Sequence, residues 1–165
     1  MILSKLFARN PTAAQRLYEA IVAGARQEKF YAEMDVPDTL DGRFDMIVLH
    51  MFLVLDRLRG EAADMGQQLT DTFFKDLDRT LREMGIGDLS VAKKIRPMAE
   101  AFAGRIKAYA TASEEGVLVE ALQRNVYGGA ANPKASDLAQ WMQSAKTKLS
   151  SMPTKSIVDG ELGLE

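Results

Sequence analysis

The residues best suited to chemistry gather in one short segment, Val36–Phe44, directly before a strongly apolar stretch. Two carboxylates and one guanidinium, those of Asp38, Asp41 and Arg43, lie there among turn-forming residues. Carboxylates can act as general bases or hold cations, and an arginine can grip a carboxylate or a phosphate through paired hydrogen bonds. Such crowding before a hydrophobic helix indicates specific contacts, either within the fold or with a partner.

His50 is the only histidine and shares a helical stripe with Arg43 and Arg57. The chain has no cysteine, so a zinc site would lack thiolates as well as a second imidazole. Haem ligation by His50 would lack an attachment motif and an evident second ligand. General base catalysis would need Asp38 or Asp41 brought close by the fold, which the spacing does not require. We therefore expect a structural or partner-contact role for His50, with no catalytic residue, metal site or cofactor.

Three further patterns suggest binding chemistry but have simpler explanations. Gly85–Gly87 lacks the full glycine pattern and the preceding strand of a phosphate loop, so it should connect two helices. The acidic run Asp71–Asp78 lacks the ligand spacing of a calcium loop and is typical of a salt-bridged helix face. The basic residues Lys93, Lys94 and Arg105 lack interleaved exposed aromatics, and the net charge of −2 disfavours nucleic acid as a partner. They should form a solvated face, or else meet an acidic partner segment or anionic lipid headgroups.

Hydrophobic periodicity predicts the helices that position these residues, and no strand pattern competes with it. Asn10, Asp41 and Asp88 are expected to cap helix starts, and Gly85 should take the left-handed conformation after a helix end. The expected helices cover approximately residues 11–27, 42–59, 62–84, 89–109, 113–127 and 136–150. Pro97 should kink or break the fourth helix near Lys93–Lys94.

These elements predict a single compact all-α domain of five to seven helices. The domain should occupy residues 1–150, and residues 151–165, with little apolar periodicity, should be a mobile tail. The longest apolar run, Met46–Leu55, is far shorter than the roughly 20 residues of a membrane-spanning helix. The protein is therefore expected to be cytoplasmic, with at most peripheral membrane contact through the amphipathic segment Met1–Arg9, which could equally fold back onto the core.

Two packing expectations follow from the same pattern. The Val36–Phe44 segment should lie against the connection Gly85–Asp88 or the neighbouring end of the third helix, because both concentrate glycine, carboxylates and arginine. The chain has nine methionines, a residue suited to adaptable apolar surfaces, although those in helical patterns should be core. The latter are Met46, Met51, Met84 and Met98.

Several separate segments together carry a family resemblance over residues 30–109. They are Phe30–Tyr31, Val36–Thr39, Asp41–Phe44, Leu49–His50, Asp56–Leu58, Asp76–Arg79, Leu81–Asp88, Met98–Phe102 and Gly104–Arg105. In this order they resemble the ubiquinol–cytochrome c chaperone family. Mitochondrial members act on newly made cytochrome b with a partner factor, and this chain is similar to the shorter bacterial form.

The resemblance implies a non-enzymatic assembly chaperone for the cytochrome bc complex, ubiquinol–cytochrome c reductase. Its expected partners are cytochrome b or an assembly intermediate of it, together with a second assembly factor, at the inner face of the cytoplasmic membrane. The candidate partner-binding residues are Asp38, Asp41, Arg43, His50, Arg57, Arg79, Arg82, Lys93, Lys94 and Arg105. Two alternatives remain: a helical cofactor-binding protein or enzyme using His50 with nearby Asp or Arg, and an adaptor for an unrelated partner. The arginines could also be internal fasteners, whose charge reversal would unfold the domain.

Overall fold

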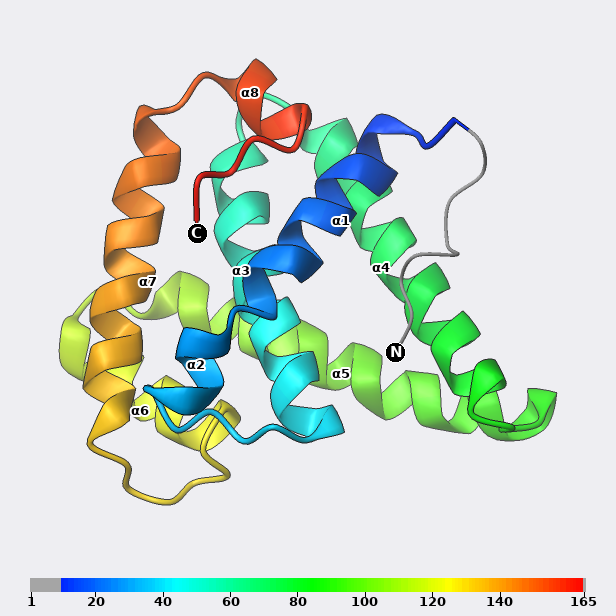
Figure 1. Cartoon of the computed structure of the whole chain (residues 1–165), viewed down its shortest axis with the longest axis horizontal. Coiled ribbons are helices and arrows are strands. Elements are labelled where there is room, and N and C mark those ends of the chain that lie inside the picture. Colours follow the sequence, from blue (N-terminus) through cyan, green and yellow to red (C-terminus); the bar gives the residue numbers. More distant parts are fainter. Residues whose placement is uncertain (1–9, 165) are drawn as a thin grey trace.

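This computed structural model describes residues 10–164 (Figure 1). Within them lie six helices of eleven residues or more and two helices of five residues, joined by loops. They are α1 (Ala13–Ala25), α2 (Glu28–Ala32), α3 (Leu40–Leu58), α4 (Ala63–Glu83), α5 (Asp88–Thr111), α6 (Glu115–Asn125), α7 (Lys134–Ser151) and α8 (Thr154–Val158). No strand occurs within these residues, and the prediction of an all-α domain is confirmed. The segment Met1–Arg9, for which membrane contact was considered, lies outside the described residues.

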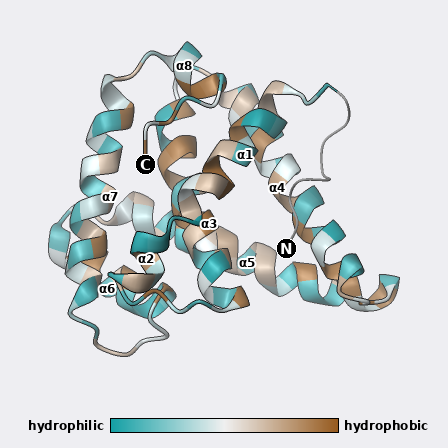
Figure 2. Ribbon diagram, viewed as in Figure 1, coloured by the Kyte–Doolittle hydropathy of each residue, from teal (hydrophilic) through white to brown (hydrophobic). Residues whose placement is uncertain are grey.

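The helix α3 occupies the centre of the fold. It packs against α1, α4, α5 and α7, and Figure 1 shows it between α7 on one side and α1 and α4 on the other. Twelve of its 19 residues are buried. A helix covered on nearly every side needs no continuous polar face, and Figure 2 shows hydrophobic colour on much of α3. Its few polar side chains must therefore find partners within the protein.

Threonines cap the starts of α1 and α3, which each differ from the expected start by two residues. In α1 the cap is Thr12, whose hydroxyl accepts from the Gln15 amide at 3.2 Å while the Gln15 side chain accepts from the Thr12 amide at 2.7 Å. This reciprocal pair is a capping box, and it replaces the cap expected at Asn10. The sequence contained this signal, a threonine followed three residues later by glutamine.

At the start of α3 the cap is Thr39, which accepts from the Gly42 amide at 3.1 Å. Asp41 is consequently in the first turn rather than at the cap, where its charge still complements the helix dipole. Asp88 is likewise the first residue of α5 and not its cap. The left-handed conformation predicted for Gly85 is confirmed, with φ of +84°.

Of the kink or break expected within the fourth helix, the break does not occur. The helix α5 runs from Asp88 to Thr111 with Pro97 inside it. A proline removes one amide donor and leaves the carbonyl four residues earlier without its helical partner. Here that residue is Lys93, which is exposed, so water can take the place of the missing donor.

The C-terminal segment differs from the mobile tail expected over residues 151–165. Within it α8 packs against α1, and Ile157, Leu162 and Leu164 are buried at 0%, 5% and 6% exposure. The Gln27 side chain also donates to the Leu164 carbonyl oxygen at 2.9 Å. The packed region therefore continues past residue 150, because three isolated apolar side chains suffice to hold a segment that shows no helical periodicity.

We predict that Gly42→Ala destabilises the fold, since a Cβ atom there would lie 1.9 Å from the Pro37 carbonyl oxygen. Relieving that overlap must displace backbone, and the free energy of unfolding should fall by about 1–3 kcal/mol. Urea unfolding measures the change. As the control, Gly104→Ala lies in α5 with nothing within 4 Å of the new Cβ, and should add about 0.5–1 kcal/mol. Equal effects from the two substitutions would contradict the close approach at Gly42.

Candidate functional site

Two adjoining cavities meet at Phe44 and Met98, which line both of them. We call the pair the groove, with an apolar end and a polar end. The apolar end is lined mainly by the start of α3 and the second half of α4, and the polar end by the start of α3, the middle of α5 and the end of α6. The polar end is the roomier, with a volume of about 540 Å³ against about 40 Å³.

The apolar end has large hydrophobic side chains that remain open to solvent. Leu40 is 49% exposed and Met84 is 56% exposed, and both line this cavity together with Leu81. Beneath them Phe73 lies 6.1 Å from Phe44 between ring centroids, as part of the core. Exposed apolar side chains above a hydrophobic floor offer a surface on which an apolar segment can be buried.

The exposure of Met84 corrects its expected place in the core. The buried stripe of α4 runs through Leu69, Phe73, Asp76 and Thr80, at spacings of three and four residues. Met84 follows Thr80 by four residues, but the helix ends at Glu83 and Met84 is its C-cap, where it is 56% exposed and lines the groove. The sequence prediction placed Met84 in the core and missed that a carboxylate, Asp76, occupies a core-facing position.

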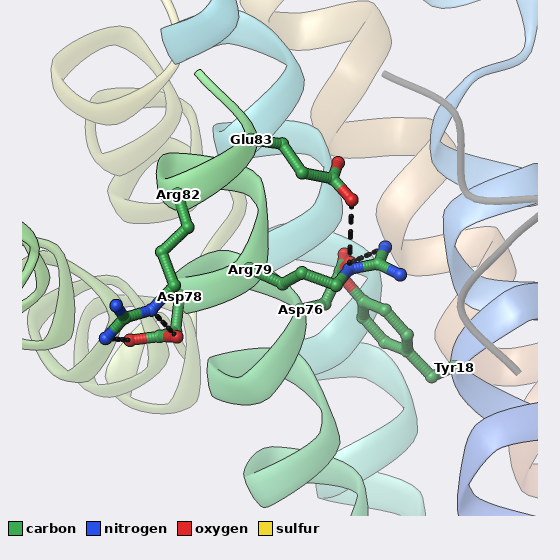
Figure 3. A network of polar contacts seen from close by, with 6 residues as sticks. All are labelled: Tyr18, Asp76, Asp78, Arg79, Arg82 and Glu83. Carbon is green, nitrogen blue, oxygen red and sulfur yellow. Dashed lines mark hydrogen bonds and ion pairs between the residues drawn. The ribbon is translucent and has the colours of Figure 1, made fainter. Parts of the chain in front are cut away.

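That buried carboxylate, Asp76, joins α1 to α4 (Figure 3). The Tyr18 hydroxyl donates to Asp76 Oδ2 at 2.7 Å, and Arg79 Nη2 donates to Oδ1 at 3.2 Å. Burial raises the pKa of Asp76 above its usual value, while these two partners favour the charged form. Burial, followed by the nearby Asp76 charge, also raises the pKa of Tyr18, so its hydroxyl stays protonated and able to donate. Both Tyr18 and Asp76 line the apolar end of the groove, where their hydrogen-bonded pair is a fixed polar group.

Arg82 forms a second, more exposed connection near the same end. Its Nε donates to Asp78 Oδ2 at 2.7 Å, and its Nη1 contacts Asp88 across the α4–α5 turn. Figure 3 shows Arg82 turned toward Asp78 and away from the group around Asp76. Because these side chains are 42% to 85% exposed, their pairing adds little stability but neutralises the acidic charges beside the turn.

The polar end of the groove contains an ion pair between α3 and α5. Arg105 Nε lies 2.8 Å from Asp45 Oδ1, although the two are not aligned for a hydrogen bond. Burial raises the pKa of Asp45 to about 7, and Arg105 opposes part of that rise. The Arg105 guanidinium also lies 5.7 Å from the ring centre of Phe44 and donates to the Asn125 carbonyl oxygen at 3.4 Å. Arg105 therefore holds α3, α5 and α6 together. From the sequence alone it was assigned only to a basic helix face.

His50 is enclosed and does not reach any surface. It is 0% exposed, with its ring 5.5 Å from Phe30 and 5.0 Å from Trp141 between centroids. Its Nδ1 donates to the Met46 carbonyl oxygen at 2.8 Å, and burial lowers its pKa to about 4. The ring is consequently neutral at physiological pH, and it packs closely below Gly24, whose added Cβ would lie 3.2 Å from it. This placement gives His50 a core role and removes it from the partner-binding candidates.

Arg57 is an internal fastener. Its side chain is 14% exposed, and it donates to the carbonyl oxygens of Leu149 at 2.9 Å and Met152 at 2.8 Å. These acceptors lie at the C-terminal end of α7, where carbonyl groups lack partners within the helix. A third donation, 3.1 Å long, reaches the Thr154 hydroxyl at the start of α8. The residue therefore ties α3 to both C-terminal helices and also leaves the candidate set.

Of the remaining candidates, the structure brings only Asp41 and Arg105 into the groove. Asp38 and Arg43 pair with each other at 2.8 Å on the surface, and their side chains are 61% and 43% exposed. The start of α3 does lie beside the end of α4, as expected, since Leu40 and Leu81 line one cavity. The contact is apolar, however, because Arg43 and the arginines of α4 pair within their own segments.

The sequence prediction missed Tyr18, Asp45 and Asp76 as members of the site. A signal existed for the two acids, since each occupies a position that helical spacing turns toward the core. Within residues 10–164, no convergence of three histidine, aspartate or glutamate side chains forms a possible metal site. None of the helices in the described part of the chain has the length and hydrophobicity needed to cross a bilayer.

Comparison with known proteins extends the resemblance beyond the segments found by inspection. Residues 32–164 match the sequence model of the family described as "Ubiquinol-cytochrome C chaperone". Ubiquinol-cytochrome-c reductase complex assembly factor 1 of Xenopus laevis is 28% identical over 119 residues, which are 69% of this chain and 60% of that protein. The mitochondrial protein CBP3 of Saccharomyces cerevisiae is 30% identical over 111 residues, 62% of this chain and 33% of that protein. The chain thus spans only part of the length of these two relatives.

A solved structure covers more of the chain. The crystal structure of the Cbp3 homolog from Brucella abortus superposes with a TM-score of 0.80 at 38% sequence identity. The superposition covers 90% of this chain and 86% of that one. The arrangement of helices described above is therefore shared with that homolog across almost its whole length.

We predict that the raised pKa of Asp45 makes part of the stability depend on pH. The carboxyl titrates near 3.8 when unfolded and near 7 when folded, so the folded state holds the proton in between and loses stability as pH rises. Asp45→Asn stays neutral throughout. As pH rises from about 5 to 8, the free energy of unfolding of the variant should increase relative to that of the wild type by about 1–3 kcal/mol. Urea unfolding across this pH range measures the difference between the two proteins. His50 titrates in both of them, so its contribution cancels in the difference. Parallel profiles would show that Asp45 titrates normally.

A second prediction separates fasteners from surface arginines. Arg57→Ala should lower the free energy of unfolding by about 2–4 kcal/mol, because it leaves several half-buried acceptors without donors. Arg43→Ala is the matched control on the same helix, and removal of its exposed pair should cost at most about 1 kcal/mol. Thermal unfolding followed by circular dichroism measures both. A larger loss from Arg43→Ala than from Arg57→Ala would overturn this division.

Proposed function

This chain belongs to the ubiquinol–cytochrome c chaperone family, and on that premise we propose that it assists assembly of ubiquinol–cytochrome c reductase by binding newly made cytochrome b or an intermediate of it. The groove is the proposed binding site. The choice rests on one observation: the exposed apolar side chains of Leu40 and Met84 line a cavity that adjoins a polar cavity.

An incompletely assembled membrane protein presents apolar helices whose ends carry polar and charged groups. The groove offers matching surfaces in sequence: apolar side chains near Leu40, then Phe44 and Met98, then the charges of Asp41 and Arg105. Met84 and Met98 can adapt to different apolar shapes, since methionine is unbranched and polarisable. Holding such a client until its membrane partners arrive requires reversible burial and no covalent step.

We propose further that the protein is not an enzyme. The enzymatic alternative depended on His50 acting with Asp38, Asp41 or Arg43. The ring of His50 is enclosed by Phe30 and Trp141, whereas Asp38 and Arg43 are paired with each other at the surface. A chaperone role leaves each of these contacts as it is.

The partners and the place of action are part of the same proposal. The relatives from Xenopus laevis and Saccharomyces cerevisiae carry names that tie them to reductase assembly and to mitochondria, respectively. For this chain we propose action in the cytoplasm at the inner face of the membrane, where a client is inserted. A second assembly factor would have the exposed charges of Arg43 and Arg82 available for docking, whereas Arg79 is only 30% exposed and pairs with the buried Asp76.

The test replaces apolar side chains of the groove and measures client capture. Leu40→Gln combined with Met98→Gln should reduce co-purification of cytochrome b about tenfold, because each change removes apolar area from the contact. Val117→Gln changes a side chain that is 45% exposed on α6, outside the groove, and should leave capture within about twofold. Melting temperatures of the three proteins separate lost binding from lost folding.

Deletion of the protein in its own cells supplies the complementary measurement. Assembled ubiquinol–cytochrome c reductase should fall while unrelated respiratory complexes remain, and the wild-type gene should restore it. Normal reductase in the deletion strain would end the assignment. Normal capture of cytochrome b by the double groove variant, with the fold intact, would instead place the binding site elsewhere.

A further inference from the structure

The turn between α4 and α5 forms one extremity of the molecule. Figure 1 shows it at the end of the long horizontal axis, where the two helices diverge from the rest of the fold. We call residues 82–97 the hairpin tip. A methyl group added at Gly85 or Gly87 would meet nothing within 4 Å, as expected of a segment that no other element covers.

Two large apolar side chains stand exposed on this tip. Leu89 is 85% exposed, the highest value among the large hydrophobic residues of the described chain, and Met84 is 56% exposed. Figure 2 shows the hydrophobic colour at the turn. A convex projection gives a leucine no concave neighbour to pack against, so an exposure of this size leaves an apolar area that a suitable partner would bury.

The charges on the tip are mainly positive. It carries four basic residues and two acidic ones on a chain whose net charge is −2. Arg82 contacts Asp88 and thereby offsets the acidic group closest to the turn. Lys93 and Lys94 form no ion pair with any side chain in residues 10–164, so their charges are free to act outward.

The apolar and basic groups share one face of α5. Lys93 and Arg96 follow Leu89 by four and seven residues, which places all three side chains on the same side of a helix. Val91, at 1% exposure, lies on the opposite side and packs inward. An outward face with a leucine in front of cations is the pattern with which short helices enter the headgroup region of a bilayer.

We propose that the hairpin tip is a docking surface for a membrane rich in anionic phospholipid. Leu89 and Met84 would enter the boundary between headgroups and acyl chains, while Lys93 and Arg96 would meet lipid phosphates. Arg96 pairs with Glu100 at 3.3 Å, but both side chains are at least 70% exposed, so a lipid phosphate can compete for the guanidinium. Charge complementarity favours an anionic bilayer as the partner. The protein as a whole is net negative and would be repelled by anionic lipid, whereas the basic hairpin tip would be attracted to it. A folded protein partner would need a shaped pocket for the convex tip, whereas a fluid bilayer accommodates it without one.

Docking through the tip also orients the groove. Met84 belongs to both features, because it lines the apolar end of the groove and stands on the tip. The apolar end would then open beside the bilayer surface. The docking surface is nevertheless independent of the proposed client, and it holds for any function exercised at a membrane.

Vesicle co-sedimentation of the full chain tests the proposal. The wild type should bind vesicles of mixed phosphatidylglycerol and phosphatidylcholine, and should bind vesicles of phosphatidylcholine alone much more weakly. Leu89→Gln, and separately Lys93→Gln with Arg96→Gln, should each weaken binding to the anionic vesicles about tenfold. The matched control, Lys75→Gln with Lys107→Gln, also removes two exposed positive charges but lies outside the tip, and should stay within about twofold of the wild type.

A fluorescent label distinguishes insertion from adsorption. Because the chain has no cysteine, Leu89→Cys and Val117→Cys can each be labelled at a single site with an environment-sensitive dye. Anionic vesicles should shift the emission of the dye at position 89 toward that of an apolar solvent and leave the dye at position 117 unchanged. Normal melting temperatures confirm that each variant is folded.

Three results would overturn the proposal: no binding of the wild type to anionic vesicles, equal loss from the tip and control variants, or an unchanged dye at position 89. If the tip variants bound vesicles normally but lost co-purified cytochrome b, the tip would be a protein interface and the lipid assignment would be wrong. Because the vesicle experiments contain no client, they leave the proposed function of the groove to its own tests.

Discussion

The enclosure of α3 by other helices is the constraint on which the rest of the structure depends. A helix with twelve of 19 residues buried has no solvent in reach of most of its side chains. Each polar group on it must be met from within the protein or lose the hydration it had when unfolded. Three residues show how far this is done: Asp45 is met by Arg105 of α5, the Nδ1 atom of His50 by a carbonyl of its own helix, and Arg57 by the end of α7. The buried Nε2 atom of His50 has no hydrogen-bond partner within the described residues.

These internal contacts also determine where a partner can bind. The ion pair of Asp45 with Arg105 holds α5 against α3 at one end of the groove, and Asp76 with Tyr18 holds α1 against α4 at the other. Buried charges such as these add little net stability, but breaking one of them is costly, so they favour a single arrangement of helices. Between the two anchors, Leu40 at the start of α3 remains half exposed. The groove is thus the place where the start of α3 is no longer covered by other helices.

The charged residues divide into two classes that have different physical consequences. Arg57 and Arg105 are largely buried and hold helices together, so their replacement should act on folding. Arg43 and Arg82 are exposed and already paired with local acids, whereas Lys93 has no such partner among residues 10–164. Interfaces draw on the second class, because exposed charges contribute little to stability yet set orientation and specificity when a partner approaches. A chaperone can carry many of them at small cost to its own fold.

The sequence by itself determined the all-α class and the positions of the six long helices to within about two residues. Helical periodicity, glycine and proline are local signals, and they act within a few turns of the chain. Only the tertiary structure decided that His50 and Arg57 face inward, that Met84 faces outward, and that Ile157 holds the C-terminal segment in place. Each of these outcomes depends on which helices meet across the core. One sequence pattern fits either a buried or an exposed side chain until the covering helix is known, because burial is a property of the neighbours and not of the residue.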